Sequence, residues 1–187
     1  MNKTIILMRH GQPQGIASAR ISALDMQGWI QAYEQASITS HPAPSSSVQL
    51  AASAARVVSS NAPRALASVR ALGLTPALVE PLFGEAQLPY GRWRWPRLSP
   101  FTWALILRML WVCGYSGQAE SAAAARLRAA LAARRLQALA CDGPVLLLGH
   151  GWMNRLIGKQ LAATGWQRQH SNGSRYWSAT LYRQVEA

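Results

Sequence analysis

Three places in this sequence put arginine or histidine directly after an apolar or strand-like run. Arg9 and His10 follow one run, Arg64 opens a helical segment after a second, and His150 follows a third. Burying a guanidinium or an imidazole costs free energy unless a partner satisfies its polar atoms. Guanidinium groups bind phosphate oxygens at two points. Two arginines and two histidines in one place would therefore form a cradle for a tetrahedral anion.

The elements that must bring these residues together alternate along the chain. A Gly-Pro turn followed by a short apolar run indicates a buried parallel strand over 143–150. We expect further strands over 4–8, 55–60, 75–80 and, at a sheet edge, 175–184; helices over 21–38, 61–73, 101–113, 118–140 and 151–164; and loops over 41–47 and 84–100. Such alternation predicts an α/β sheet covered on both faces. Ligands bind at the carboxyl ends of the strands in these sheets, where helix N-termini also attract phosphate.

Four motifs in this order resemble those of the histidine phosphatase superfamily, in its phosphoglycerate-mutase-like group. They are RHG at 9–11, SSNAPRALAS at 59–68, Glu85 in EPLFGEAQLP, and LLLGHG at 146–151. The resemblance covers roughly 1–85 and 141–160. It implies a three-layer α/β/α sandwich with a mostly parallel central sheet. It also implies one domain over 1–187, with a variable helical and loop insert around 86–140.

The resemblance implies catalytic roles for five side chains. His10 would attack phosphorus to form a phosphohistidine, while Arg9 and Arg64 would hold the non-bridging oxygens. His150, cationic against the phosphate dianion, would stabilise the transition state. Glu85 would protonate the leaving oxygen and later activate water. The implied activity is phosphomonoester hydrolysis of the histidine acid phosphatase type, with no metal and no cofactor.

Two glutamates compete for the proton-donor role. Glu80 ends a predicted strand, whereas Gly84 and Pro89 place Glu85 in a loop that can reach the cleft. We favour Glu85 and keep Glu80 as the alternative.

Residues beside the motifs are expected to contact the substrate. The sequence departs from the family pattern at Ile16 and at Trp152, where the tryptophan makes one pocket wall bulkier. The expected substrate-binding residues are Gly11, Gln12, Gly151, Arg92 and Trp93. The last two belong to GRWRWPRLSP, 91–100, which fits either a rim for an acidic or aromatic substrate group or tryptophans packed on the core.

The charge of the chain favours anionic ligands. Lysine and arginine number 19 against 7 acidic residues, a formal net charge of +12. We expect a small phosphorylated substrate, with phosphate or sulfate able to fill the site. The arginines of 126–135 fit a solvated helix face better than a nucleic-acid site, so nucleic acid is not the expected partner.

Cysteine usage and the N-terminal sequence favour a cytoplasmic protein. Cys113 and Cys141 lack metal or redox spacing and are expected to be small buried residues in a reducing compartment. The first residues do not resemble a signal peptide. The apolar stretch 103–115 is too short to span a bilayer and contains Arg108, so we expect a buried or cleft-lining helix.

Two other functions fit the same residues. A phosphoglycerate-type mutase would use the same phosphohistidine but shield it from water. A non-catalytic basic protein would bind phosphorylated partners or nucleic acid on the same scaffold. The sequence predicts neither the natural substrate nor the oligomeric state.

Overall fold

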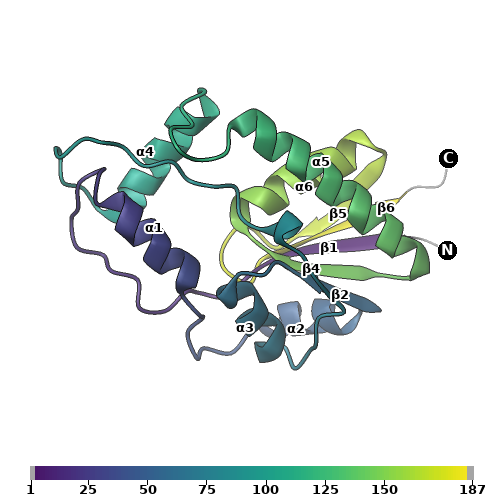
Figure 1. The fold of residues 1–187 in the computed structure, drawn as a ribbon. Coiled ribbons are helices and arrows are strands. Elements are labelled where there is room, and N and C mark those ends of the chain that lie inside the picture. The colour runs from purple at the N-terminus through teal and green to yellow at the C-terminus, as the bar shows by residue number, and fades with distance from the viewer. Residues whose placement is uncertain (1–2, 185–187) are drawn as a thin grey trace.

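Short runs of Val, Ile and Leu form the middle of a six-stranded sheet in the computed structural model, which describes residues 3–184 (Figure 1). Its strand order is β3-β2-β4-β1-β6-β5. All five residues of the central strand β4 are buried, as the apolar run predicts. The strands are β1 (Thr4–Arg9), β2 (Arg56–Ser59), β3 (Leu78–Val79), β4 (Val145–Gly149), β5 (Trp166–Ser171) and β6 (Ala179–Gln184).

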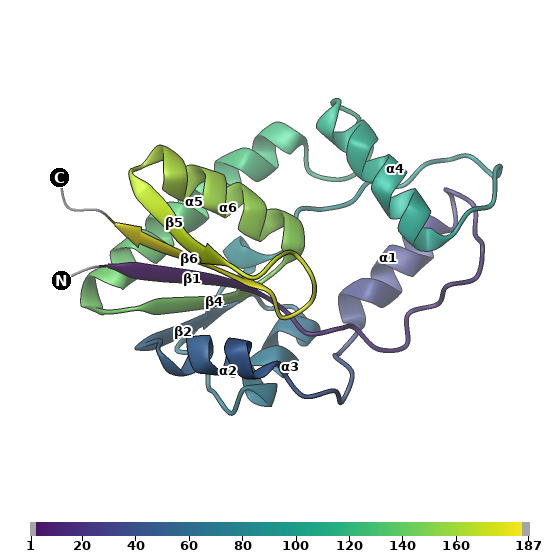
Figure 2. The same ribbon diagram turned by 180° about the vertical axis from the view of Figure 1, so that it is seen from behind.

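Helices cover both faces of this sheet (Figure 2). Alternate residues of β1 point to opposite faces, so Ile6 packs with α2 and α3, and Leu7 packs with α5 and α6. The predicted three-layer α/β/α sandwich is confirmed. The helices are α1 (Met26–Gln35), α2 (Ser45–Ala52), α3 (Pro63–Ala71), α4 (Pro100–Val112), α5 (Ala122–Leu139) and α6 (Gly151–Ala163), with short 3₁₀ turns η1 (Pro81–Phe83) and η2 (Ala140–Asp142).

The strand pairing brings the polar strand ends to one edge. β1, β2, β3 and β4 are mutually parallel, whereas β6 is antiparallel to both β1 and β5. Arg9 is level with Gly149, and Ser59 is level with Leu148. Arg9, Ser59 and Gly149 end their strands, so the segments that follow them meet above the same edge of the sheet.

The strand predicted over 175–184 is present as the shorter β6, but its predicted place at the sheet edge is wrong. β6 lies between β1 and β5, and the edge strand on that side is β5. The sequence of β5, WQRQHS, buries only Trp166 and leaves its other residues exposed. An edge strand with so few apolar residues carries little periodic signal, which is why the pattern missed it.

The predicted helix over 21–38 is also too long. Its first residues form a turn, because the Asp25 carboxylate accepts hydrogen bonds from the Ser22 N–H and hydroxyl at 3.0 and 2.7 Å. α1 begins after this turn. It packs with α4 in a separate small core beyond the sheet end, in which Met26 and Leu107 are fully buried. We refer to α1, α4 and the segment between Ala86 and Ser99 as the cap.

Both cysteines are free and exposed, so the expectation that they are buried is wrong. Among residues 3–184, none of the helices is both long and apolar enough to cross a bilayer.

Candidate active site

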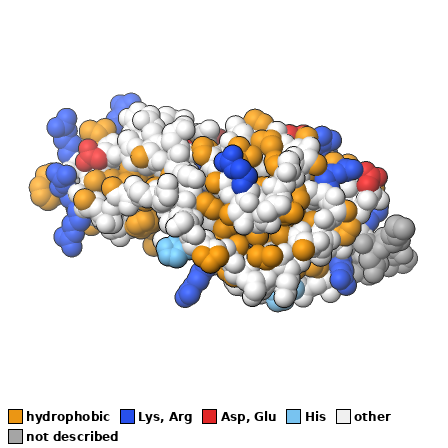
Figure 3. Space-filling model, turned by 90° about the horizontal axis from the view of Figure 1, so that it is seen from below, with side chains coloured by type: hydrophobic (Ala, Val, Ile, Leu, Met, Phe, Trp, Pro, Cys, Tyr) orange, Lys and Arg blue, Asp and Glu red, His pale blue; other side chains and the backbone are white. Residues whose placement is uncertain are grey.

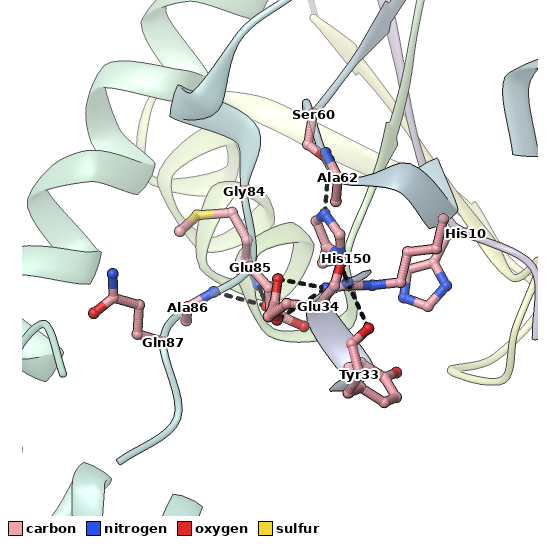
Figure 4. A network of polar contacts seen from close by, with 12 residues as sticks. His10, Tyr33, Glu34, Ser60, Ala62, Gly84, Glu85, Ala86, Gln87 and His150 are labelled. Carbon is pink, nitrogen blue, oxygen red and sulfur yellow. Dashed lines mark hydrogen bonds and ion pairs between the residues drawn. The ribbon is translucent and has the colours of Figure 1, made fainter. Parts of the chain in front are cut away.

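Two buried imidazoles lie beside each other at the carboxyl edge of the sheet. The rings of His10 and His150 are 5.2 Å apart between centroids, in an edge-to-face arrangement (Figure 4). His10 follows β1, and His150 is the N-cap residue of α6 after β4. Only 1 % of His10 and none of His150 is exposed. The predicted pair of histidines is therefore together in the structure.

The hydrogen bonds of the His10 ring leave one nitrogen free. Nδ1 lies 2.7 Å from the carbonyl oxygen of Gly11, and a carbonyl can only accept, so Nδ1 carries the proton. Nε2 then holds the lone pair of a neutral imidazole. Burial, together with the nearby His150 and Arg64, lowers the pKa of His10 well below its ordinary value of 6.5. The ring is thus neutral near pH 7, which is the state a nucleophile needs.

His150 is held by a serine from the neighbouring strand end. Its Nε2 lies 2.7 Å from the hydroxyl of Ser60, which follows β2. Burial, with Arg64 and Arg9 nearby, lowers the pKa of His150 well below 6.5. The neutral ring of His150 is therefore favoured in this structure, whereas the predicted cation concerns the complex with a phosphate dianion. A bound dianion would favour the cation again.

Each of the two predicted arginines is stacked on a tyrosine. The Arg9 guanidinium carbon is 4.4 Å from the centroid of Tyr176, and the Arg64 carbon is 4.9 Å from that of Tyr33. Arg9 also donates a hydrogen bond of 2.9 Å to the carbonyl of Ser174. The Tyr176 ring is 5.7 Å from the His10 ring. Burial raises the pKa of Tyr33, so this ring stays neutral.

The sequence predicted that the Arg64 guanidinium is free to contact phosphate at two points. In the structure it is bound to α1 instead. One terminal nitrogen donates to the carbonyls of Tyr33 and Glu34 at the end of α1, at 3.1 and 3.2 Å. The other donates to the Glu34 carboxylate at 3.2 and 3.3 Å. Arg64 is fully buried, while 48 % of the Glu34 side chain is exposed. In this structure the Glu34 carboxylate therefore binds the Arg64 guanidinium, which was predicted to bind phosphate.

Three buried nitrogens around the histidines lack a hydrogen-bond partner. They are Nε of Arg9, Nε of Arg64 and Nδ1 of His150. Arg9 and Arg64 both lie near enough to His10 and His150 for their charges to lower the pKa of each ring. Buried polar atoms are nearly always hydrogen-bonded, so these nitrogens are suited to bind a ligand or water that enters the site. An anion is the ligand that could accept from both guanidinium groups.

Glu85 caps the N-terminus of α6, a structural role that the amino-acid sequence did not indicate. Its carboxylate accepts from the backbone N–H groups of Ala86, Trp152 and Met153, at distances between 2.8 and 3.2 Å. The last two groups open α6, which has no side-chain cap of its own. A carboxylate at a helix N-terminus satisfies these donors and the helix dipole. Glu85 thus fixes the helix that begins next to His150 (Figure 4).

The competing glutamate lies elsewhere. Glu80 accepts from Arg135 of α5 at 3.1 Å on the exposed side of that helix. It does not line the large cavity, whereas Glu85 does. Position therefore favours Glu85, and its role in proton transfer remains a prediction.

A cavity of about 1010 Å³ lies between the sheet end and the cap. Its inner end is formed by Arg9, Glu34, Glu85 and Tyr176, and the buried His10, Arg64 and His150 are not part of its wall. Its outer part lies between α1 and α4 and combines apolar and aromatic side chains with polar ones such as Gln27 and Gln31. The side chains there include Trp29, Ile30, Leu88, Tyr90, Phe101 and Ala104.

The predicted substrate-binding residues divide into two groups. Gly11 and Gly151 lie at the site: a side chain on Gly11 would come within 2.7 Å of the Trp177 ring, and one on Gly151 would meet Arg9. Gln12 is exposed and is not part of the cavity wall. Arg92 and Trp93 also lie outside that wall. Trp93 stacks on Trp103 of α4 at 6.4 Å, so it packs partly on the cap, as the alternative reading expected.

Several residues at the site were not found from the sequence. Tyr33, Glu34 and Tyr176 belong to no motif and reach the site only through the tertiary fold. Arg128 was assigned to a solvated helix face, and this is wrong. Its guanidinium is part-buried and donates to the carbonyls of Leu82, Gly84 and Glu85, as well as to Glu120. Within residues 3–184, no group of His, Cys, Asp or Glu is arranged to hold a metal ion.

Comparison with known proteins gives matches among solved structures only. No protein-family model matches the chain, and no curated protein matches it in sequence. A functionally characterised open reading frame product of Mycobacterium tuberculosis aligns over 100% of this chain and 97% of its own, with 18% identity and a TM-score of 0.63.

Two further structures carry informative names. Phosphoserine phosphatase from Entamoeba histolytica, solved as a histidine-to-alanine mutant with phosphoserine, covers 95% of this chain and 89% of its own, with 14% identity and a TM-score of 0.60. A mycobacterial glucosyl-3-phosphoglycerate phosphatase covers 88% and 80%, with 20% identity and a TM-score of 0.50. At these identities the likeness is one of fold. The chain therefore shares the α/β/α fold of these solved structures.

Proposed function

We propose that this chain is a histidine phosphatase, which hydrolyses a phosphomonoester through a phosphohistidine on His10. The observation that carries the proposal is the set of unpaired buried nitrogens of Arg9, Arg64 and His150 around the His10 ring. A phosphoryl group bound there would accept from both guanidinium groups, which otherwise keep unsatisfied donors in the protein interior.

In the first chemical step, the lone pair on Nε2 of His10 attacks phosphorus. The bond from phosphorus to the leaving oxygen breaks, and that oxygen takes a proton from Glu85. The Gly11 carbonyl holds Nδ1 so that Nε2 is the attacking atom. Arg9, Arg64 and His150 stabilise the charge on the non-bridging oxygens.

In the second step, water attacks the phosphohistidine. Glu85, now a carboxylate, takes a proton from that water while the bond between phosphorus and Nε2 breaks. Inorganic phosphate and neutral His10 are the products, so the cycle closes with no other co-reactant. We assign proton transfer to Glu85 because it lines the cavity and Glu80 does not.

Substrate binding requires a rearrangement at α1. His10 is buried, and both terminal nitrogens of Arg64 are bound to the end of α1. A phosphate dianion and the Glu34 carboxylate would repel each other while competing for Arg64. We therefore expect the phosphoryl group to displace the Glu34 side chain, which is half-exposed and can move toward solvent.

The outer cavity indicates the chemical class of the leaving group. Its wall carries a cluster of apolar and aromatic side chains from α1 and α4 beside polar ones such as Gln31, and Arg108 is already bound to the carbonyls of Ala86 and Gln87. We propose a phosphomonoester whose leaving group has a bulky apolar part. In this proposal the segment 86–140, within a single domain, is the variable insert that determines specificity.

The test compares the wild-type chain with His10→Ala on 4-nitrophenyl phosphate and on phosphomonoesters of increasing alkyl or aryl size. Circular dichroism checks the fold of the variant. We expect turnover that is lost in His10→Ala and a kcat/KM that rises with apolar size. Turnover that survives in the variant contradicts the proposal. Phosphate binding without turnover by the wild type would favour the non-catalytic alternative, and transfer to a second metabolite would favour a mutase.

A further inference from the structure

Helix α4 has the opposite polarity to that of an ordinary surface helix. Its one charged residue, Arg108, is 5 % exposed and points inward, where it donates to the Ala86 and Gln87 carbonyls. Its solvent side is apolar instead of polar, contrary to the usual amphipathic pattern. We call this side the α4 outer face. It comprises Phe101 (51 % exposed), Leu105 (65 %), Met109 (57 %), Leu110 (36 %) and Val112 (44 %).

A cationic and aromatic segment leads directly into this helix. Residues 92–97, which we call the Arg/Trp loop, carry exposed Arg92, Arg94 and Arg97 interleaved with two tryptophans, Trp93 and Trp95. Trp95 is 78 % exposed, the most of any large apolar side chain in the described chain. Trp93 anchors the loop by stacking on Trp103 of α4. Figure 3 shows basic and hydrophobic side chains gathered at the left end, which carries α1 and α4 in Figure 1.

These features are those of a surface that lies at a membrane interface. Peripheral helices bury an apolar side among lipid chains, tryptophan prefers the headgroup level, and each nearby arginine is attracted to anionic lipid. α4 has 13 residues, fewer than the roughly 20 that span a bilayer, so it would lie in the interface. We propose that the α4 outer face and the Arg/Trp loop dock on a bilayer that contains anionic phospholipid.

Charge favours this occupant over a second copy of the chain. The loop carries three arginines, and the carboxylate adjoining it, Asp25, is already held by Ser22. Leu24 next to Asp25 donates to the Trp93 carbonyl at 3.2 Å, which fixes this neighbourhood. Two copies joined through this surface would bring two sets of arginines together, in chains that each carry a net charge of +12. An anionic lipid surface would attract the same arginines.

The docking surface adjoins the cavity. Phe101 belongs both to the α4 outer face and to the apolar cavity wall. A docked molecule would therefore hold its cavity close to the lipid surface. The inference does not depend on the proposed function, because it concerns residues outside the His10 site.

Vesicle flotation tests the proposal with phosphatidylcholine vesicles, with and without phosphatidylglycerol. The variant Leu105→Glu/Met109→Glu places charges on the α4 outer face. Its matched control is Leu127→Glu/Leu131→Glu on α5, where the same kind of exposed leucines (63 and 47 % exposed) lie outside the surface. A second variant replaces Arg92, Arg94 and Arg97 with Gln. Thermal unfolding checks that all variants fold.

We expect the wild type and the α5 control to float with the anionic vesicles at least about tenfold more than with neutral ones, and less at high salt. The α4 variant should lose this binding. Each arginine removed should lower it roughly fivefold at low salt. Binding that is unchanged in the α4 variant overturns the proposal, as does equal loss in the α5 control. Absence of flotation by the wild type would also overturn it, and a dimer that the α4 variant abolishes would then favour a second copy.

Discussion

The sheet end around His10 and the cap around α4 depart from ordinary burial in opposite directions. At the sheet end, His10, Arg64 and His150 are at most 1 % exposed. Nε of Arg64 and Nδ1 of His150, together with Nε of Arg9, are buried and have no hydrogen-bond partner. In the cap, large apolar residues such as Leu105 and Trp95 face solvent. Each departure disfavours the isolated folded chain, through unpaired polar atoms in one region and exposed apolar area in the other.

The contrast indicates which kind of partner each region is suited to bind. Buried donors without partners are satisfied by a small anion, which can enter a closed site and accept from several nitrogens. Exposed apolar area is covered only by a larger surface. The following predictions concern first the sheet end, where the effects are largest, and then the contact between Glu34 of the cap and Arg64.

Replacing a site arginine by lysine should cause the largest loss of activity toward 4-nitrophenyl phosphate among these variants. In Arg64→Lys the charge stays, but the guanidinium that binds α1 and faces the site is gone. We expect kcat/KM for 4-nitrophenyl phosphate to fall by about 10²–10³. The matched control is Arg135→Lys, whose partner Glu80 lies on the exposed side of α5. Similar activities of the two variants would contradict the importance of the buried arginine.

Glu85→Gln should separate proton transfer from helix capping. The amide oxygen of glutamine can still accept from the α6 backbone, but the side chain no longer donates an acidic proton. We expect turnover of an alkyl phosphate to fall by about 10²–10³, and that of 4-nitrophenyl phosphate far less, because its leaving group needs little protonation. The measurement is kcat for both esters.

Glu80→Gln is the control for that comparison. It removes the ion pair with Arg135 and leaves the cavity wall unchanged. Suppose that the loss of kcat depends on the leaving group in Glu80→Gln and not in Glu85→Gln. The proton donor would then be Glu80, and the assignment by cavity position would be wrong.

The two buried histidines should make the free protein acid-sensitive. Their pKa values lie well below 6.5 in the folded chain, mainly because of burial, so the unfolded chain binds protons first as pH falls. The free energy of unfolding should therefore be constant above pH 6.5 from this source and decrease below it, by up to about 1.4 kcal/mol per pH unit for each histidine. Urea unfolding between pH 7.5 and about 5 measures this slope.

The double variant His10→Gln/His150→Gln should have a smaller slope, whereas His41→Gln should keep it, because His41 is exposed. Stability that rises on acidification of the wild type would contradict neutral buried histidines. Saturating phosphate should reduce the slope as well, since the dianion favours the protonated His150.

Glu34→Gln should produce the smallest effect of these variants, and it should strengthen phosphate binding instead of weakening the site. Without the carboxylate, phosphate no longer competes with an anion for Arg64. We expect the inhibition constant of inorganic phosphate to fall about three- to tenfold, a modest change because Glu34 is half-exposed and its charge is partly screened. Weaker inhibition in Glu34→Gln would instead mean that Glu34 helps to hold the site open to phosphate.

The sheet was the part of the fold most accessible from the sequence. The apolar run of β4 and the Gly-Pro turn before it leave few alternatives to a buried strand. β5 was not predicted because only Trp166 of that strand is buried. The helix predicted over 21–38 was too long because Asp25 and Ser22 form a turn within an otherwise helical pattern. Local signals therefore fail where a strand is at an edge or where side chains cap a turn.

The site was predictable where motifs follow strands. His10, His150 and the two arginines were predicted to converge, and their roles remain predictions. Glu34, Tyr33 and Tyr176 could not be found, because they reach the site from a cap helix and from a loop before β6 that no motif marks. The capping of α6 by Glu85 joins residues about 67 positions apart, which no local pattern encodes.

Rapid quench of the wild-type chain with labelled 4-nitrophenyl phosphate, followed by digestion and mass spectrometry, tests the central claim most directly. We predict an acid-labile, base-stable phosphate on the peptide that contains His10, formed in the first turnover and absent in His10→Ala. Phosphate release in the first turnover with no label on that peptide would contradict the account.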